Sequence, residues 1–158
     1  MGTEIERKFL VTNDSWRAAS TGKRYCQGYI STTQPGHSVR VRIAGSRAYL
    51  TIKGPSQGLS RAEFEYEIPL DDAQEMLETL CDRPLIEKTR YCLPIGPVVW
   101  EIDEFIGENA GLVVAEVELK NAEQPVALPD WIGQEVSGEP RYYNQSLVKN
   151  PYSQWAKG

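Results

Sequence analysis

The chain has 158 residues, 41% of them hydrophobic and 25% charged, which is ordinary for a globular protein with one core. The formal net charge of −5 argues against general affinity for nucleic acid or anionic membranes, so local basic clusters must bind any anion. No apolar run is long enough to span a membrane, and the three cysteines lack the CxxC spacing of zinc sites. We therefore expect one cytoplasmic domain over residues 1–158, monomeric or homodimeric, without nucleic-acid or membrane partners.

Polar and apolar residues alternate along most of the chain, which predicts β-strands with two chemically different faces. The first such stretch is EIERK, in which Glu4, Glu6 and Lys8 share one face. In chain order, the predicted strands are EIERK (4–8), RYCQGYIS (24–31), VRVRI (39–43), AYLTIKG (48–54), AEFEYEI (62–68), IEKTRY (86–91), VWEIDEF (99–105) and VVAEVEL (113–119). Eight short strands separated by turn-like residues predict a mainly β fold.

The helical signals are few. Ala73, Met76, Leu77 and Leu80 follow the spacing of an amphipathic helix over 71–80. Shorter helices are expected at 13–20 and 141–150, and the proline-containing stretch 121–140 is expected to be an irregular connection. We predict an eight-stranded antiparallel barrel with a few helices packed outside, because the apolar strand faces can be covered by such helices.

If the apolar faces point outward, the charged faces line the interior. The acids on these faces are Glu4, Glu6, Glu63, Glu65, Glu67, Glu101, Asp103, Glu116 and Glu118, and the bases are Lys8, Arg40, Arg42, Lys53, Lys88 and Arg90. An enclosed excess of carboxylates is costly unless cations join them, and oxygen ligands without thiolate or imidazole favour Mg²⁺ or Mn²⁺. A hard metal beside several Arg and Lys side chains indicates a site for more than one phosphate.

A different arrangement also produces such alternation. A two-sheet protein with one solvated face would place the same charges in water, and its function would then be interaction with other proteins. The residues alone leave this alternative open.

The ordered series of motifs resembles the CYTH superfamily, the triphosphate tunnel metalloenzymes. EIERK matches the ExExK signature, and VRVRI, TIKG, the EFE of EFEYE, EKTRY, EIDEF, AEVEL and RYYNQSL follow in the family's order. The match spans residues 4 to about 147, and ExExK alone would be weak. The resemblance implies an eight-stranded β-tunnel that binds a triphosphate with divalent metal ions, two in number.

Residue by residue, the resemblance implies three groups. Glu4, Glu6, Asp103, Glu116 and Glu118 are expected to be metal ligands, with Glu101 and Asp103 as supporting acids near a second metal and its water. The expected phosphate-binding residues are Lys8, Arg40, Arg42, Lys53, Lys88 and Arg90, and Glu63 and Glu65 match the family's central ExE. The catalytic set implied is Glu4, Glu6, Lys8, Glu101 and Asp103, while Tyr142 and Asn144 match a C-terminal motif that braces or plugs one tunnel end.

The chain looks most like the short bacterial inorganic triphosphatases, which predicts hydrolysis of tripolyphosphate to pyrophosphate and phosphate. Three alternatives stay open at this point. They are a class IV-type adenylate cyclase, a thiamine or nucleoside triphosphatase, and a polyphosphate-binding module without catalysis.

Overall fold

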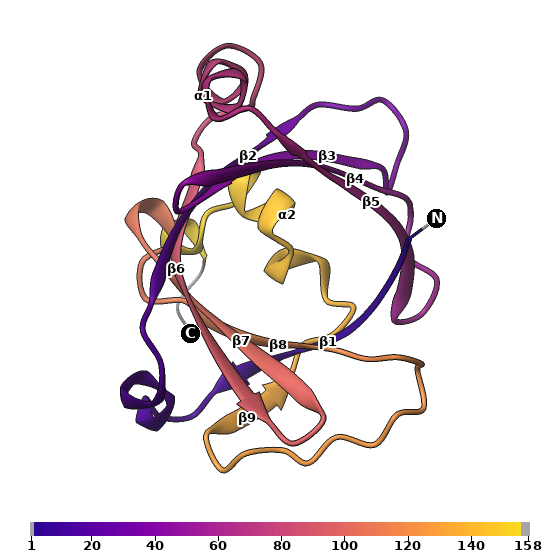
Figure 1. Cartoon of the computed structure of the whole chain (residues 1–158), viewed down its shortest axis with the longest axis vertical. Helices are drawn as coiled ribbons and strands as arrows, with labels where there is room; N and C mark the ends of the chain where they lie inside the picture. The colour runs from indigo at the N-terminus through magenta and orange to yellow at the C-terminus, as the bar shows by residue number, and fades with distance from the viewer. Residues whose placement is uncertain (1, 156–158) are drawn as a thin grey trace.

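The computed structural model describes residues 2–155, which form a closed antiparallel β-barrel (Figure 1). The strands are β1 (Thr3–Val11), β2 (Lys23–Ile30), β3 (Ser38–Ala44), β4 (Arg47–Lys53), β5 (Ser60–Ile68), β6 (Ile86–Ile95), β7 (Val98–Phe105), β8 (Val113–Glu118) and β9 (Ile132–Glu135). Their order is β5-β4-β3-β2-β6-β7-β8-β1, and pairing of β5 with β1 closes the ring. All eight predicted strands are therefore confirmed, and so is the barrel.

The strand register shows which side chains face inward. Residues directly opposite each other on neighbouring strands lie on the same face. The opposed pairs run around the whole ring as Glu6 with Glu118, Glu116 with Glu101, Asp103 with Arg90, Lys88 with Tyr25, Gln27 with Arg42, Arg40 with Thr51, Lys53 with Glu63, and Arg61 with Glu4. The charged faces of separate strands therefore share one interior, and the solvated-sheet alternative is wrong.

The outward faces are apolar and are covered by segments between the strands. Trp16, in a short 3₁₀ helix at Ser15–Ala19, and Trp131 pack against Trp100 and other outward residues of β1, β7 and β8. Helix α1 (Leu70–Thr79) lies outside the barrel and buries Ala73 and Leu77 against Val41 and Ala48. Leu80, which we expected in the apolar stripe, is 58% exposed just beyond the end of α1.

The C-terminal segment closes one end of the barrel. It contains helix α2 (Asn144–Lys149) between 3₁₀ turns at Pro140–Tyr142 and Tyr152–Gln154, and in Figure 1 α2 lies within the ring of strands. At this end the inward residues are apolar, and Ile86, Phe105 and Val114 pack in one cluster with Leu147 and Val148. This hydrophobic contact explains why α2 enters the barrel end, whereas the strand pattern led us to expect helices packed outside.

Three further details differ from the expectations. Strand β9 pairs with the end of β1 inside a stretch that we expected to be irregular. Residue Glu67 is exposed beside Arg47 and lies outside the cavity, although its position on the strand suggested an interior acid. Strand β6 continues to Ile95 rather than ending at 91. In the described residues, no helix combines the length and apolar character needed to cross a membrane.

Candidate active site

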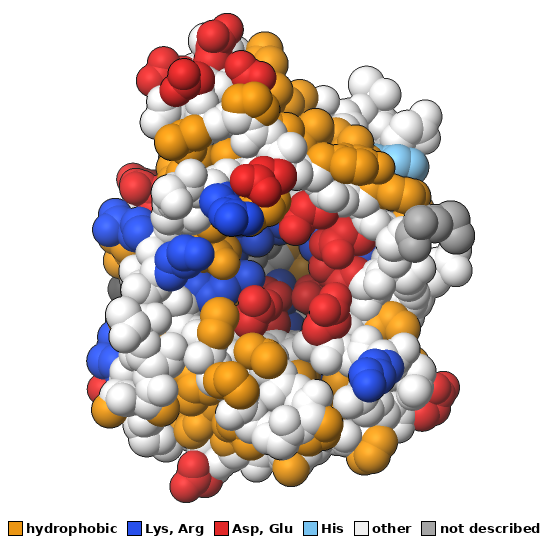
Figure 2. All heavy atoms as spheres, in the orientation of Figure 1, with side chains coloured by type: hydrophobic (Ala, Val, Ile, Leu, Met, Phe, Trp, Pro, Cys, Tyr) orange, Lys and Arg blue, Asp and Glu red, His pale blue; other side chains and the backbone are white. Residues whose placement is uncertain are grey.

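The barrel encloses a polar cavity that opens at the end opposite α2. Its volume is about 230 Å³, somewhat below the roughly 300–1,000 Å³ of pockets for drug-sized organic ligands. Figure 2 looks into its mouth, where acidic side chains gather on one side of the hollow and basic side chains on the other. Such a division suits a ligand that combines an anion with metal cations.

Nearly all of the residues predicted for the site line this one cavity. They are Glu4, Glu6, Lys8, Arg40, Arg42, Lys53, Glu63, Glu65, Lys88, Arg90, Glu101, Glu116 and Glu118. The exception is Asp103, which is buried behind the lining. The name acidic wall is used here for the cavity-lining carboxylates of β1, β5 and β8, which are Glu4, Glu6, Glu63, Glu65, Glu116 and Glu118. The name basic wall is used for Arg40, Arg42, Lys88 and Arg90.

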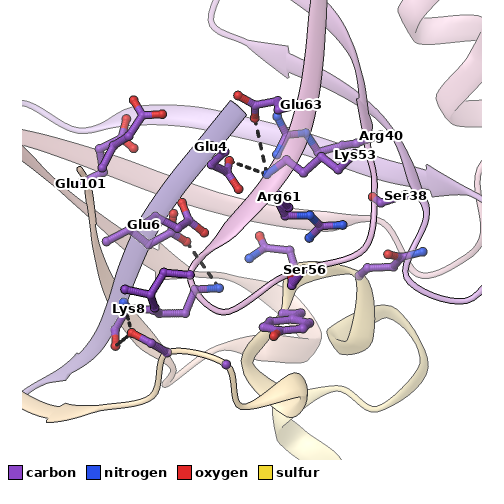
Figure 3. Close-up of a pocket in the computed structure, with 18 of the residues that line it drawn as sticks. Glu4, Glu6, Lys8, Ser38, Arg40, Lys53, Ser56, Arg61, Glu63 and Glu101 are labelled. Carbon is purple, nitrogen blue, oxygen red and sulfur yellow. Dashed lines mark hydrogen bonds and ion pairs between the residues drawn. The ribbon is translucent and has the colours of Figure 1, made fainter. Parts of the chain in front are cut away.

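Two lysines form ion pairs with carboxylates of the acidic wall. The Lys53 Nζ atom lies 2.7 Å from a carboxylate oxygen of Glu4 and 3.5 Å from one of Glu63 (Figure 3). The Lys8 Nζ atom lies 3.5 Å from a carboxylate oxygen of Glu116. Although burial opposes it, the Lys8 charge lowers the pKa of Glu116 to about 2. These lysines therefore balance part of the wall's negative charge.

The remaining negative charge of the acidic wall is not balanced. Burial, together with the charges of Glu116 and Glu4, raises the pKa of Glu6 well above its usual value. Burial and the neighbouring Glu4 also raise the pKa of Glu63 to about 7. Within residues 2–155, no three acidic, histidine or cysteine side chains are gathered closely enough to hold a metal ion. The donor chemistry nevertheless fits a hard divalent cation, because crowded carboxylates are stabilised by one.

The basic wall is held from behind by Asp103. One oxygen of Asp103 accepts a hydrogen bond from Arg90 Nε at 2.7 Å, and the other accepts from Arg90 Nη2 at 2.9 Å and Lys88 Nζ at 2.7 Å. Burial alone would raise the pKa of Asp103, but the charges of Arg90 and Lys88 lower it far below its usual value. Both of its oxygens are therefore engaged by cations.

Arg40 lines the cavity and carries a buried donor that is not satisfied. Its Nη2 atom donates to Thr51 Oγ1 at 3.1 Å and to Glu65 Oε2 at 3.3 Å. Its Nε atom is buried and has no hydrogen-bond partner among residues 2–155. An unsatisfied buried donor is costly unless a ligand accepts from it.

Sequence reasoning missed several lining residues. Arg61 shares its face with Glu63 and Glu65 and lines the cavity, where its Nε donates to the carbonyl of Gly54. We began that strand at residue 62, although the period of two extends one step further back to Arg61. Tyr29, Ser38 and Ser56 also line the cavity, and their uncharged side chains gave no comparable signal.

The C-terminal segment supplies the floor of the cavity. Asn144 Oδ1 accepts a hydrogen bond from Lys88 Nζ at 2.8 Å, and the carbonyl of Tyr142 accepts one from Lys8 Nζ at 3.4 Å. Tyr143, Asn144 and Gln145 are part of the lining. This placement agrees with the expectation that the C-terminal motif with Tyr142 and Asn144 braces one tunnel end.

Comparison with known proteins identifies relatives over almost the whole chain. The inorganic triphosphatase of Acetivibrio thermocellus is 53% identical over 152 residues, covering 96% of this chain and 97% of that protein. The inorganic triphosphatase of Nitrosomonas europaea is 40% identical, covering 92% and 97% of the two chains. The crystal structure of the inorganic triphosphatase NE1496 superposes with a TM-score of 0.63 at 30% identity, over 98% of this chain and 99% of that one.

The sequence pattern of the CYTH domain matches residues 2–152. Together with the closed barrel and its charged interior, this match confirms the resemblance noted in the sequence. The chain belongs to the CYTH domain family.

Proposed function

We propose that this protein is an inorganic triphosphatase that hydrolyses tripolyphosphate to pyrophosphate and phosphate inside the barrel. The observation that carries the proposal is the division of one cavity into an acidic and a basic wall. The names of the two curated relatives, at 53% and 40% identity over nearly full length, support the same activity.

The basic wall would bind the phosphate chain. Arginine grips phosphate oxygens with paired N–H groups, and lysine contributes a compact charge. Arg40, Arg42, Lys88 and Arg90 are all at least nine-tenths buried. Their charges therefore act in a medium that screens them less than water does, and they stabilise negative charge that develops on the departing pyrophosphate.

The acidic wall would hold Mg²⁺ or Mn²⁺. Glu4, Glu6, Glu116 and Glu118 are the residues that we assign as ligands. A bound divalent ion neutralises phosphate charge and lowers the pKa of a bound water. The carboxylates that remain free on this wall orient the attacking water toward the phosphate chain.

The positions of Lys8 and Lys53 indicate where the reacting phosphate would lie. Lys53 and Lys8 stand among the carboxylates rather than on the basic wall. A phosphate placed between the walls would reach these lysines on one side and the arginines on the other. We therefore assign Lys8 and Lys53 to the phosphoryl group that is transferred to water.

Asp103 receives a different role from the one implied by the family resemblance. Because both of its oxygens are engaged by Arg90 and Lys88, we propose that it positions the basic wall and is not a metal ligand. Glu101, whose carboxylate lies 3.3 Å from Arg90, lines the cavity and remains a supporting acid in this proposal.

The test is release of phosphate from tripolyphosphate, ATP and thiamine triphosphate in parallel, each with Mg²⁺, Mn²⁺ or EDTA. We expect fast, metal-dependent release from tripolyphosphate and much slower release from the other two. Formation of cyclic AMP from ATP without phosphate release from tripolyphosphate would contradict the proposal. Tight binding of tripolyphosphate without hydrolysis would identify a binding module instead.

A further inference from the structure

A buried glutamine lies directly behind the basic wall. Gln27, on β2, is 0% exposed and does not line the cavity. Its Oε1 atom accepts a hydrogen bond from Arg42 Nε at 2.7 Å. Its Nε2 atom donates to the hydroxyl of Tyr29 at 3.1 Å and to Asn144 Oδ1 at 3.2 Å. Both ends of the amide are therefore committed to residues that line the cavity.

Arg42 differs from the other five predicted phosphate-binding residues in its electrostatic surroundings. Lys8, Arg40, Lys53, Lys88 and Arg90 each form a salt bridge with a carboxylate. Among the described residues, Arg42 has no such partner. It is held by the neutral amide of Gln27, and its guanidinium lies 4.9 Å from the centre of the Tyr25 ring. Its positive charge is thus left for a ligand.

The hydrogen-bond chemistry of an amide explains why glutamine suits this position. A glutamate of the same shape would also accept from Arg42, but it would neutralise the guanidinium. It would also lose the two donated hydrogen bonds, because an ionised carboxylate has no hydrogen to donate to Tyr29 or Asn144. Asn144 Oδ1 in turn accepts from Lys88, so the amide links two members of the basic wall.

We propose that Gln27 is a positioning residue that fixes the Arg42 guanidinium for phosphate binding without neutralising it. The linkage through Asn144 sets the position of Lys88 relative to Arg42 and ties both to the closed end of the barrel. The inference rests on the proposed function in one respect, namely that the anion of this cavity is a tripolyphosphate.

The test compares Gln27→Glu and Gln27→Met with the wild type. Gln74→Glu and Gln74→Met, on the exposed face of α1, are matched controls for the added charge and the lost amide. Binding of tripolyphosphate is measured by calorimetry in EDTA, where no turnover interferes, and kcat and KM are measured separately with Mg²⁺. A charge-assisted hydrogen bond is strong enough to change affinity by about tenfold or more.

We expect Gln27→Glu to raise Kd by about tenfold or more, and Gln27→Met to raise it by several-fold, because methionine keeps the Arg42 charge but not its position. KM should rise with Kd, while both Gln74 variants match the wild type. In an Arg42→Met background, the neutral change Gln27→Met should raise Kd by less than it does in the wild type, because no guanidinium remains to be held.

Unchanged Kd in Gln27→Glu and Gln27→Met, with only a lower Tm, would show a merely structural role and overturn the proposal. If Gln27→Glu does not fold, Gln27→Met and its combination with Arg42→Met decide the question by the same readout. A wild type that binds tripolyphosphate but does not hydrolyse it would refute the proposed function and leave the Kd comparison intact. A wild type that binds tripolyphosphate neither in EDTA nor with Mg²⁺ would overturn both.

Discussion

Replacement of Asp103 by asparagine tests how the basic wall is assembled. Asp103 is 1% exposed and so is Lys88, and together with Arg90 they form a buried cluster of one carboxylate and two cations. Removing one partner of a buried ion pair costs about 3–5 kcal/mol, because a charge is left uncompensated. For a chain of this size, each kcal/mol lowers Tm by about 2–4 °C. We therefore expect Asp103→Asn to lower the Tm of the metal-free protein by about 6–20 °C.

The measurement is thermal unfolding in EDTA at neutral pH, followed by circular dichroism. Glu104→Gln is the matched control. Glu104 follows Asp103 in the chain, and its carboxylate pairs with Arg17 on the outer surface. Exposed ion pairs of this kind contribute about 1 kcal/mol or less to stability. A Tm within about 2 °C of the wild type in EDTA, combined with a loss of stabilisation by Mg²⁺, would refute the positioning role. That result would restore Asp103 as a metal ligand.

Three other variants probe the acidic wall and the closed end. Glu6→Gln should nearly abolish release of phosphate from tripolyphosphate, because it removes a proposed metal ligand, and full activity with Mg²⁺ would contradict that assignment. Glu63 has a pKa of about 7 in the folded protein against 4.5 as its ordinary value, so its ionisation destabilises the fold as pH rises through that interval. In EDTA, Glu63→Gln should therefore have a Tm a few degrees above the wild type at pH 8 and close to it at pH 4.5, and equal differences at both values would exclude this cause. Leu147→Ala should lower the unfolding free energy by about 2–5 kcal/mol in a denaturant titration, because Leu147 is fully buried within the barrel end.

The strand pattern made the barrel and most of its site predictable from the sequence. Inward residues of this barrel are charged and outward residues apolar, so the period of two is visible on almost every strand. It places Glu4, Arg40 and Glu116 on one interior although they are far apart in the chain. The order of the motifs then identified the family.

The level of each side chain along the barrel axis could not be predicted from the strand pattern. The period of two gives the face of a strand but not the level at which a side chain lies. Glu101 and Asp103 share a face, yet Glu101 lines the cavity and Asp103 is buried behind Arg90. Phe105, on the same face, packs with the C-terminal helix instead.

Features that depend on contacts between distant parts of the chain were also missed from the sequence. Strand β9 is only four residues long and follows a proline-containing stretch, so its pairing with β1 carries no local signal. Gln27 is an uncharged residue on a weak strand, and its importance follows only from its contacts with Arg42 and Asn144. Arg61 was missed because the strand was predicted to begin at residue 62, two residues after its start at Ser60.

The most direct test of the central claim is a ³¹P NMR time course of tripolyphosphate with the wild-type protein and Mg²⁺. The proposed activity predicts that the tripolyphosphate signals disappear while pyrophosphate and orthophosphate appear in equal amounts, and that EDTA stops the reaction. Unchanged tripolyphosphate, in the presence of Mg²⁺ or Mn²⁺ and of folded protein, would contradict it.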